Sequence, residues 1–410
     1  MWIHCILTKA EKFGKERILP ACFVCGILAD KTSLNNKTDM AYTPFTPLQQ
    51  LIIERIQREG PLTFAEYMRM ALYEPNYGYY MTGSTRIGFE GADFFTSTDV
   101  SATLFANCLG RQLHQWWEKL GYRTPFVILE QGAGRGNLAR GIQEWAAQQD
   151  TGFQAALVYR LEDIGRGQDA FLAEKSDANA EPVPFVILSN ELVDAFPVHI
   201  VEAHDARLYE IYVDVEAGRL REVRGEPSTA EVAAYLDTYH IPWTLFGDGW
   251  RAEINLAALR WIRRTAHLLR RGYILAIDYG DKARALYTRY RRHGTLACYF
   301  QHQLNERPLA RPGEQDITAH VNFSALINEG RLQGLRLHKY TTQRLWLESL
   351  GIHEELERRR LSDFAESVTA RASDRGQVAL LQWYDLRQRA AALTDPNGMG
   401  NFKVLILRRN

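Results

Sequence analysis

One stretch of sequence decides the fold of this chain: Phe126-Val127-Ile128-Leu129-Glu130-Gln131-Gly132-Ala133-Gly134-Arg135-Gly136. A short continuous apolar run comes first, alternating glycines follow, and a helix is expected to begin near Leu138. Glycines allow a sharp turn and let a ligand approach the backbone closely. The order predicts a buried strand, a tight loop and a helix whose first N–H groups are free to bind an anion.

Further apolar runs end in polar residues in the same way. They cover residues 156–161 before Glu162, 183–188 before Ser189-Asn190-Glu191, and 273–277 before Asp278-Tyr279-Gly280. Runs that are apolar on both faces, with helical segments between them, predict a parallel sheet covered by helices on both sides. In an open sheet of this kind ligands bind at the carboxyl ends of the strands, so the polar residues mark the expected site.

Flanking segments predict a helical cover and an insertion. Thr46-Pro47 starts one helix, and the capping box Thr63-x-x-Glu66 starts the next. Apolar residues at every second position of 209–215 predict a strand of an antiparallel insertion. The other expected elements are helices at 101–120 and 254–269, late strands at 335–340 and 402–407, and a mostly helical stretch between those strands.

Composition limits the class of protein. The chain has 410 residues, 46% of them hydrophobic, and its 49 Lys and Arg balance 49 Asp and Glu. These values exclude a disordered chain, and zero net charge argues against bulk binding to nucleic acid. No stretch reaches the ~20 apolar residues that a membrane-spanning helix needs.

The cysteines indicate the compartment. They are Cys5, Cys22, Cys25, Cys108 and Cys298. So few, with three near the start, predict a reducing, cytoplasmic location without structural disulfides. The lone Cys22-x-x-Cys25 has no second ligand pair at metal-binding spacing, so we expect no bound metal.

The first residues differ from the rest of the chain. Residues 1–39 show neither helical nor strand periodicity, and Met40 opens a segment of ordinary pattern. We expect 1–39 to be a disordered or spurious extension. A targeting peptide, with a basic region before an apolar run, is the alternative.

The spacing of the glycines separates two classes of cofactor. A hydride-transfer fingerprint is G-x-G-x-x-G, but counted from Gly132 its third glycine falls on Asn137. The run present, E-x-G-x-G-x-G from Glu130 to Gly136, looks like motif I of class I methyltransferases that use S-adenosylmethionine (SAM). There the leading acid helps to hold the cationic methionine end. Glu162, after the next strand, is placed to accept hydrogen bonds from both ribose hydroxyls.

Ordered blocks outside the glycine loop carry a family resemblance. They are Tyr67-Met68, Ala71-Leu72, Pro75 and Gly78-Tyr79-Tyr80; Asp93-Phe94, Thr96, Ser101 and Phe105; Asn190-Glu191, Asp194-Ala195 and Pro197-Val198-His199; Asp278-Tyr279-Gly280; Gly294-Thr295-Leu296; Asp316 to Val321; and Gln343 with Leu350-Gly351-Ile352. In this order they resemble the MidA-type methyltransferases. That family includes a mitochondrial complex I assembly factor that methylates a protein arginine.

The resemblance implies an α/β fold: a Rossmann-like class I methyltransferase sheet of seven strands, mostly parallel with an antiparallel last strand, with a helical N-terminal cover and α+β insertions. We expect the cover and a cofactor-closing loop at 40–120, the SAM-binding core at 121–345 with an insertion around 200–260, and a helical segment with the final strand at 346–410. The implied cofactor contacts are Glu130, Gly132, Gly134, Arg135, Gly136, Glu162, Asp93 and Thr96.

One segment departs from the family. The chain between Glu162 and Asn190 is short where the family normally fits a further strand, whose end touches the adenine. Asp163 and Gln168 are the nearby candidates for the adenine side of the pocket.

The acceptor side is expected at Asn190-Glu191-x-x-Asp194, just after a strand. An arginine guanidinium, with a pKa above ~12, is a poor nucleophile while protonated, so its site needs carboxylates that orient it and offset its charge. Glu191 and Asp194 would share one face of a helical turn. With Asn190 and His199, a proton relay, they form the predicted catalytic set. Two alternatives stay open: Asn190 caps a short helix, and His199 is structural.

These observations predict a SAM-dependent methyltransferase that acts on a protein. The resemblance points to an arginine, with a respiratory-complex-type subunit as a candidate substrate. One alternative is a non-catalytic assembly or scaffolding factor that retains the fold, disfavoured by the intact glycine loop with Glu162 and Glu191. The other is a nicotinamide-dependent oxidoreductase, disfavoured by Asn137 and the leading Glu130.

Overall fold

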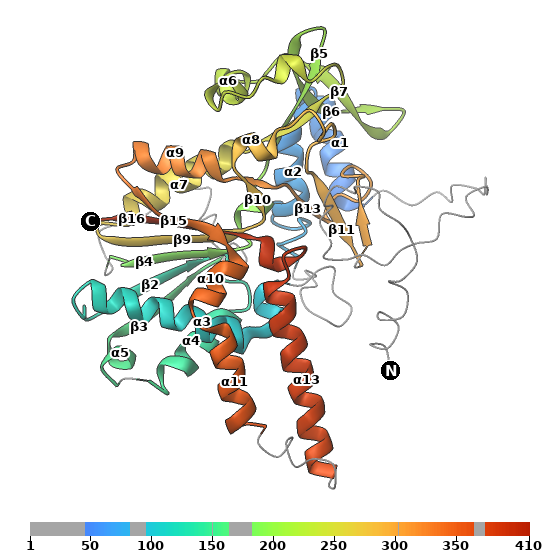
Figure 1. Ribbon diagram of the computed structural model, residues 1–410. Coiled ribbons are helices and arrows are strands. Elements are labelled where there is room, and N and C mark those ends of the chain that lie inside the picture. Colours follow the sequence, from blue (N-terminus) through green and yellow to red (C-terminus); the bar gives the residue numbers. More distant parts are fainter. Residues whose placement is uncertain (1–45, 83–95, 150, 164–182, 302, 365–373) are drawn as a thin grey trace, which may run out of the picture.

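The computed structural model describes residues 46–82, 96–149, 151–163, 183–301, 303–364 and 374–410 (Figure 1). Its centre is a sheet in the order β15-β16-β9-β4-β2-β3. The strands are β2 (Phe126–Gln131), β3 (Leu157–Glu162), β4 (Val186–Asn190), β9 (Gly272–Asp278), β15 (Arg336–Thr342) and β16 (Lys403–Arg409). Strands β3, β2, β4 and β9 are parallel, and β16 runs antiparallel to β9 and β15. The predicted mostly parallel sheet with an antiparallel last strand is confirmed.

The described part of the sheet has six strands, one fewer than the seven expected. The family's further strand would belong between Glu162 and Val186, and residues 164–182 lie outside the described residues. Within the described part, β3 is therefore the edge of the sheet.

Helices cover both faces of this sheet. Ile128, Leu188 and Leu275 pack in one core with α3 (Ser97–Lys119) and α4 (Asn137–Ala146). Ile187 and Ile274 face the opposite way, towards α7 (Leu256–Leu268) and α9 (Phe323–Leu332) (Figure 1). Successive strand residues point to opposite faces, so burial of both faces explains the continuous apolar runs.

The N-terminal helices pack on a second, antiparallel sheet. Helix α1 (Pro47–Glu59) begins where the Thr46 hydroxyl accepts a hydrogen bond from the Gln49 N–H, and α2 (Phe64–Tyr73) begins with the predicted capping box. The second sheet comprises β1 (Leu62–Thr63), β5 (His199–His204), β6 (Arg207–Glu216), β7 (Arg219–Gly225) and β8 (Arg251–Ile254). Phe64 of α2 shares its core with Ile211 of β6.

Helix α3 does not belong with this cover. It begins at Ser97 rather than Ser101, and Ser101 itself is non-helical (φ −158°, ψ 85°). The Ser101 hydroxyl accepts a hydrogen bond from the Leu104 N–H, so the residue restarts the helix after a kink. Phe105 and Trp116 of α3 lie in the same hydrophobic core as the central sheet. The boundary expected at residue 120 therefore does not separate two cores.

Short elements complete the chain between these layers. They are β10 (Gly280–Asp281), β11 (Ala297–Phe300), β12 (Gln303–Asn305), β13 (Asp316–Thr318), β14 (Val321–Asn322), α5 (Thr151–Ala156), α6 (Ala230–Thr238), α8 (Ala283–Leu286) and 3₁₀ turns at Val193–Ala195, Trp243–Leu245 and Met399–Asn401.

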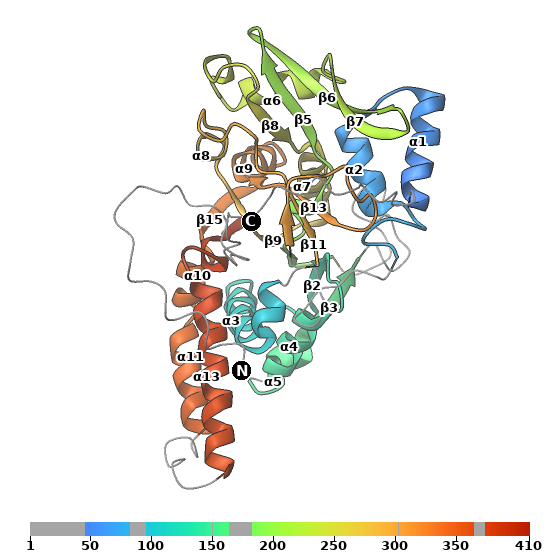
Figure 2. The same ribbon diagram turned by 90° about the vertical axis from the view of Figure 1, so that its right-hand side faces the viewer.

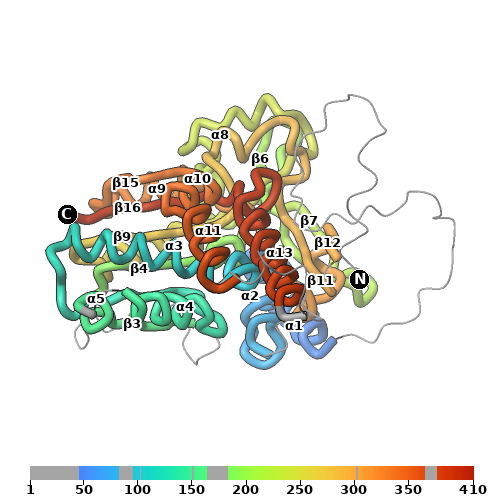
Figure 3. Tube along the Cα trace, turned by 60° about the horizontal axis from the view of Figure 1, so that its bottom comes forward, coloured from blue at the N-terminus to red at the C-terminus, as the bar shows by residue number. Residues whose placement is uncertain are grey.

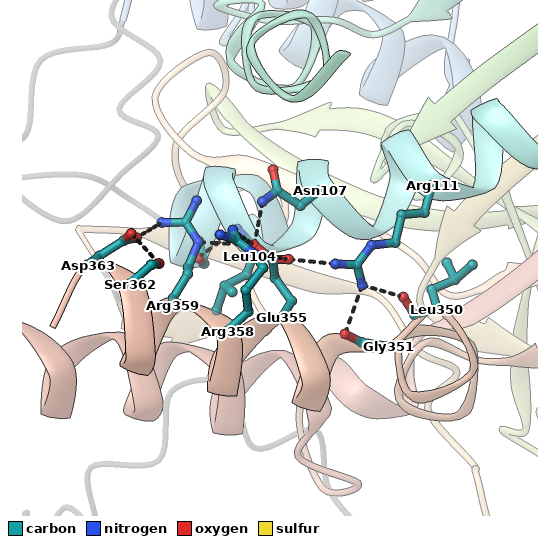
Figure 4. Close-up of polar contacts among 11 residues, drawn as sticks. Leu104, Asn107, Arg111, Leu350, Gly351, Glu355, Arg358, Arg359, Ser362 and Asp363 are labelled. Carbon is teal, nitrogen blue, oxygen red and sulfur yellow. Dashed lines mark hydrogen bonds and ion pairs between the residues drawn. The ribbon is translucent and has the colours of Figure 1, made fainter. Parts of the chain in front are cut away.

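The predicted helical stretch near the C-terminus consists of α10 (Gln343–Ser349), α11 (Ile352–Ser362) and α13 (Asp374–Thr394). Helices α11 and α13 lie side by side beyond the sheet (Figure 2) and next to α3 (Figure 3). Glu355 fixes α11 to α3: it is 1% exposed and accepts hydrogen bonds from Asn107 (2.8 Å), Arg111 (2.5 Å) and Arg358 (2.6 Å) (Figure 4). A buried carboxylate needs such partners.

Several sequence predictions concern residues beyond the described ranges. Residues 1–39, Met40 and the Cys22-x-x-Cys25 pair all lie there. Within the described residues no helix is long and apolar enough to cross a membrane. Cys108 and Cys298 are buried free thiols.

Candidate active site

The glycine loop lies at the carboxyl end of β2, as predicted. Gly132, Gly134 and Gly136 have φ of 73°, 52° and 71°, a left-handed conformation that favours glycine. A Cβ on Gly132 would lie 2.9 Å from a Leu192 methyl carbon, whereas a Cβ on Gly134 would meet nothing within 4 Å. Helix α4 begins directly after Gly136 without a side-chain cap, so its first N–H groups are available to an anion.

Glu130 lies near the end of β2, just before the loop. Its side chain is buried, its Oε2 makes no hydrogen bond of good geometry among the described residues, and the hydroxyl of the neighbouring Tyr159 partly favours its ionised form. Burial raises the pKa of Glu130 to about 7. A buried carboxylate oxygen without a donor is unfavourable, and a ligand ammonium would supply both a donor and the opposite charge.

Glu162, the predicted ribose ligand, ends β3 directly beside Gln131 of β2. Its Oε2 accepts a hydrogen bond from Gln131 Nε2 (2.7 Å), and its Oε1 pairs with Arg264 of α7 (3.1 Å). Asp163 Oδ2 accepts a hydrogen bond from the Gly134 N–H (2.5 Å). Binding of the ribose by Glu162 stays a prediction. A ligand hydroxyl that bonded to the Glu162 carboxylate would share this carboxylate with Arg264.

The remaining cofactor predictions receive less support from the geometry. Arg135 is exposed. Thr96 caps α3, where its hydroxyl accepts a hydrogen bond from the Asp99 N–H (3.3 Å). Asp93 and Gln168 lie outside the described residues.

Glu191 joins three elements at the acceptor side. Its Oε1 accepts hydrogen bonds from the Ser97 N–H (2.8 Å) at the start of α3 and from the Asn190 side chain (3.1 Å). Its own N–H donates to the Ile277 carbonyl (2.8 Å) of β9. Glu191 has φ of 51°, a strained conformation for a residue with a side chain. Such strain is held in place by surrounding contacts and is common at functional sites.

Asp194 lies in the 3₁₀ turn that follows β4 and is buried. The Tyr279 hydroxyl donates to Asp194 Oδ2 in a short hydrogen bond, and Asp194 Oδ1 is buried with no partner in the described part of the chain. Asp278, at the end of β9, caps the turn: its Oδ2 accepts hydrogen bonds from the N–H groups of Val193 (2.9 Å) and Asp194 (3.3 Å).

Burial makes ionisation of Glu191, Asp194 and Asp278 unfavourable. Burial raises the pKa of Glu191 to about 8 and that of Asp194 to about 6. Burial and the charges of Asp194 and Glu191 raise the pKa of Asp278 well above its ordinary value. None of the three forms an ion pair with a basic side chain of the described residues. A cationic ligand would supply the missing counter-charge.

One expectation and one open alternative about this segment need correction. Glu191 and Asp194 do not share the face of one helical turn, because Glu191 is left-handed and the 3₁₀ turn begins only at Val193. Asn190 caps no helix, since its side-chain amide donates to Glu191 and the turn is capped by Asp278.

His199 contacts Glu210 rather than a carboxylate of the predicted catalytic set. Its Nδ1 lies 2.7 Å from Glu210 Oε1, across β5 and β6 of the second sheet, and it bonds to neither Glu191 nor Asp194. The geometry agrees with the structural alternative, and a proton relay through His199 stays a prediction without a contact that supports it.

Sequence reasoning missed the contacts that orient Asp194. Asp278 and Tyr279 were identified only as polar residues at the end of a strand, and the Tyr73 hydroxyl, which donates to the Ala195 carbonyl (2.8 Å), was not among the candidates. The position of Asp278 and Tyr279 at a strand end was a usable signal. Their pairing with the turn after β4 depends on β4 and β9 being neighbours, which the sequence pattern does not state.

A parallel sheet covered on both faces, an antiparallel strand beyond β9, and a glycine loop that follows β2 and precedes an uncapped helix define the class: a SAM-dependent methyltransferase of class I architecture. Residues 108–341 match the family described as "Putative S-adenosyl-L-methionine-dependent methyltransferase", and the chain belongs to it. The protein is thus a methyltransferase whose methyl donor is SAM.

Similar proteins agree with this assignment. A protein from Burkholderia thailandensis, crystallised with S-adenosyl-homocysteine, is 30% identical with a TM-score of 0.74 and matches 88% of this chain and 92% of its own. The protein arginine methyltransferase NDUFAF7 homolog of Drosophila melanogaster is 27% identical over 86% of this chain and 83% of its own. The human mitochondrial protein arginine methyltransferase NDUFAF7 is 26% identical over 89% of this chain and 85% of its own.

The residues present fit this donor. The buried, unpaired Oε2 of Glu130 suits the ammonium of the methionine part, and the uncapped start of α4 suits its carboxylate. The open space beside Gly134 lets a ligand approach the loop backbone.

Proposed function

We propose that this methyltransferase modifies an arginine side chain of a protein, with Asp194 and Glu191 orienting the guanidinium. One observation carries the proposal: Glu191, Asp194 and Asp278 are buried together, without a basic partner in the described part of the chain. A guanidinium would offset their charge and can donate to carboxylate oxygens in a fork geometry. The names of the curated relatives point to the same substrate class.

SAM supplies an electrophilic methyl group, and the chain has to orient the acceptor nitrogen and receive its proton. Overall, the methyl–sulfur bond of SAM would break and leave S-adenosyl-homocysteine, an acceptor N–H would become N–CH₃, and one proton would be released. Asp194, with a pKa of about 6, is ionised at neutral pH, and its Oδ1 is free to accept that proton. Glu191, with a pKa of about 8, is protonated in the empty site and would ionise beside a bound cation.

The test is incubation of the full chain with methyl-labelled SAM and cell lysate, followed by mass spectrometry of the labelled proteins. We expect label on arginine, and loss of the label with the Asp194→Asn variant. Asp214→Asn is the matched control, because Asp214 is a part-buried aspartate on β6 of the second sheet. Label on another residue type would refute the arginine assignment.

The same experiment addresses the alternatives. Binding of SAM without any transfer would favour a non-catalytic assembly factor, and a calorimetric titration with NADH tests the oxidoreductase. Mass spectrometry of the labelled proteins would identify the substrate protein, for which a respiratory-complex-type subunit is the candidate. The cytoplasmic location remains a proposal from the cysteine distribution, whereas several relatives are named mitochondrial; imaging of the tagged full chain tests it.

A further inference from the structure

We propose that Tyr279 is a positioning residue for the acceptor: its hydroxyl holds one oxygen of Asp194, so that the other oxygen is presented to a cationic acceptor group as a carboxylate. This inference rests on the proposed function, because the acceptor cation is the ligand that Asp194 would meet.

The first step is the geometry around Asp194. Tyr279 binds its Oδ2, Asp278 holds its N–H, and the Ala319 N–H donates to its carbonyl (3.0 Å). Three contacts from two other segments therefore fix this residue. Of the two carboxylate oxygens of Asp194, Oδ1 is the one without a hydrogen-bond partner in the described chain. A carboxylate fixed through one oxygen offers the second in a single direction.

The second step is the electrostatic surroundings. The titratable groups that face Asp194 and Tyr279 are Glu191, Asp278, Tyr73, Tyr80, Asp316, Tyr299 and His320. All but His320 are acids or phenols, and burial lowers the pKa of His320 to about 4, so that it is neutral at pH 7. Within this set the Tyr279 hydroxyl is the side-chain donor that favours the ionised form of Asp194.

The third step is the state of Tyr279 itself. Burial and the neighbouring Asp194 raise its pKa well above the ordinary value, so it remains a neutral donor throughout the working pH range. Its ring packs against His320 (5.5 Å between centroids) and Phe402 (5.5 Å), which restricts where the hydroxyl can point.

The experiment compares Tyr279→Phe with Tyr67→Phe in the full chain. Tyr67 is a matched control, because it is also buried but its hydroxyl donates to the Pro308 carbonyl (2.6 Å) and to no carboxylate. Transfer of label from SAM to lysate proteins is measured from pH 5 to 9, together with the affinity for S-adenosyl-homocysteine. For Tyr279→Phe we expect unchanged affinity, turnover about tenfold lower at pH 7, and turnover within about threefold of the wild type at pH 9.

A second readout needs no acceptor. Because burial raises the pKa of Asp194, its contribution to stability is present at low pH and is lost as the pH rises through about 6. Without the Tyr279 donor the pKa of Asp194 rises further, so this loss of stability continues to higher pH. The difference in melting temperature between the wild type and Tyr279→Phe should therefore grow between pH 5 and 8. The corresponding difference for Tyr67→Phe should stay constant.

The outcomes separate the two proposals. A difference in melting temperature for Tyr279→Phe that is the same at every pH, or turnover reduced equally at pH 7 and 9, would reduce Tyr279 to a packing residue and overturn this inference. A wild type that labels only uncharged acceptors would instead overturn the proposed arginine function, and the inference with it.

Discussion

The two halves of the site are built differently. The donor half is local: Glu130, Gly132, Gly134 and Gly136 follow one another in a single strand, loop and helix start. The acceptor half is assembled from distant segments: Ser97 from α3, Asp194 from the turn after β4, and Tyr279 from the end of β9. The geometry of the donor half therefore depends on backbone conformation within one segment, whereas the geometry of the acceptor half depends on side-chain contacts between neighbouring strands.

The largest effect is expected at the centre of the assembled half. Asp194→Asn removes the carboxylate but keeps the shape, so turnover should fall on the order of 10³-fold, the middle of the range for a lost proton acceptor. The affinity for SAM, measured by calorimetry, should be unchanged. If the SAM affinity falls in parallel with turnover, the two halves are not separable and the comparison is wrong.

The next effect tests the local half through its backbone. At Gly134, alanine finds open space but must adopt a φ of 52° and would occupy room that a ligand needs. We expect the SAM affinity to fall about 100-fold, ~2.7 kcal/mol. Gly121→Ala is the matched control, since Gly121 also has a positive φ (85°) and open space, but ends α3 away from the loop. Gly121→Ala should cost stability of about 1 kcal/mol and leave the SAM affinity unchanged.

The difference between the local donor half and the assembled acceptor half also explains which parts of the site the sequence could predict. The strand, glycine loop and helix were predicted correctly because their signals lie within a few residues, and so were the capping box at Thr63 and the strand at 209–215. The helical turn expected at Glu191 and Asp194 was wrong, because contacts with Ile277 and Asp278 of another strand override the local spacing. Backbone donors such as the Ser97 N–H carry no residue-type signal at all.

A smaller effect is expected at Glu130, with a defined pH dependence. Glu130→Gln should weaken SAM binding about tenfold, ~1.4 kcal/mol, through loss of a charged partner for the ammonium. Because burial raises the pKa of Glu130 to about 7, wild-type affinity should rise with pH through 7, whereas the affinity of the variant should not.

The stability of this variant should move in the opposite sense. The folded-state pKa of Glu130 is raised from 4.5 to about 7, so its contribution to stability is full below pH 4.5 and is lost as the pH rises through 7. Without ligand, Glu130→Gln should therefore match the wild type near pH 4 and exceed it by up to ~3 kcal/mol at pH 8 in denaturant unfolding. Equal stability of both proteins at pH 8 would contradict the assigned burial of this charge.

The smallest effect distinguishes a ligand contact from a structural one. Glu162 already binds Gln131 and Arg264, so a ribose hydroxyl would add to existing contacts rather than fill an unpaired oxygen, in contrast to Glu130. Glu162→Gln should lower the SAM affinity only about threefold, ~0.7 kcal/mol. Arg264→Gln, which removes the ion pair but leaves the carboxylate, should leave the SAM affinity within about twofold of the wild type. A 100-fold loss of SAM affinity with Glu162→Gln would show that Glu162 is a principal contact of the cofactor rather than a contact shared with Gln131 and Arg264. It would also give the donor half a principal contact from a second strand, β3, whose side chain is paired with Arg264 of α7, and so weaken the contrast between the halves.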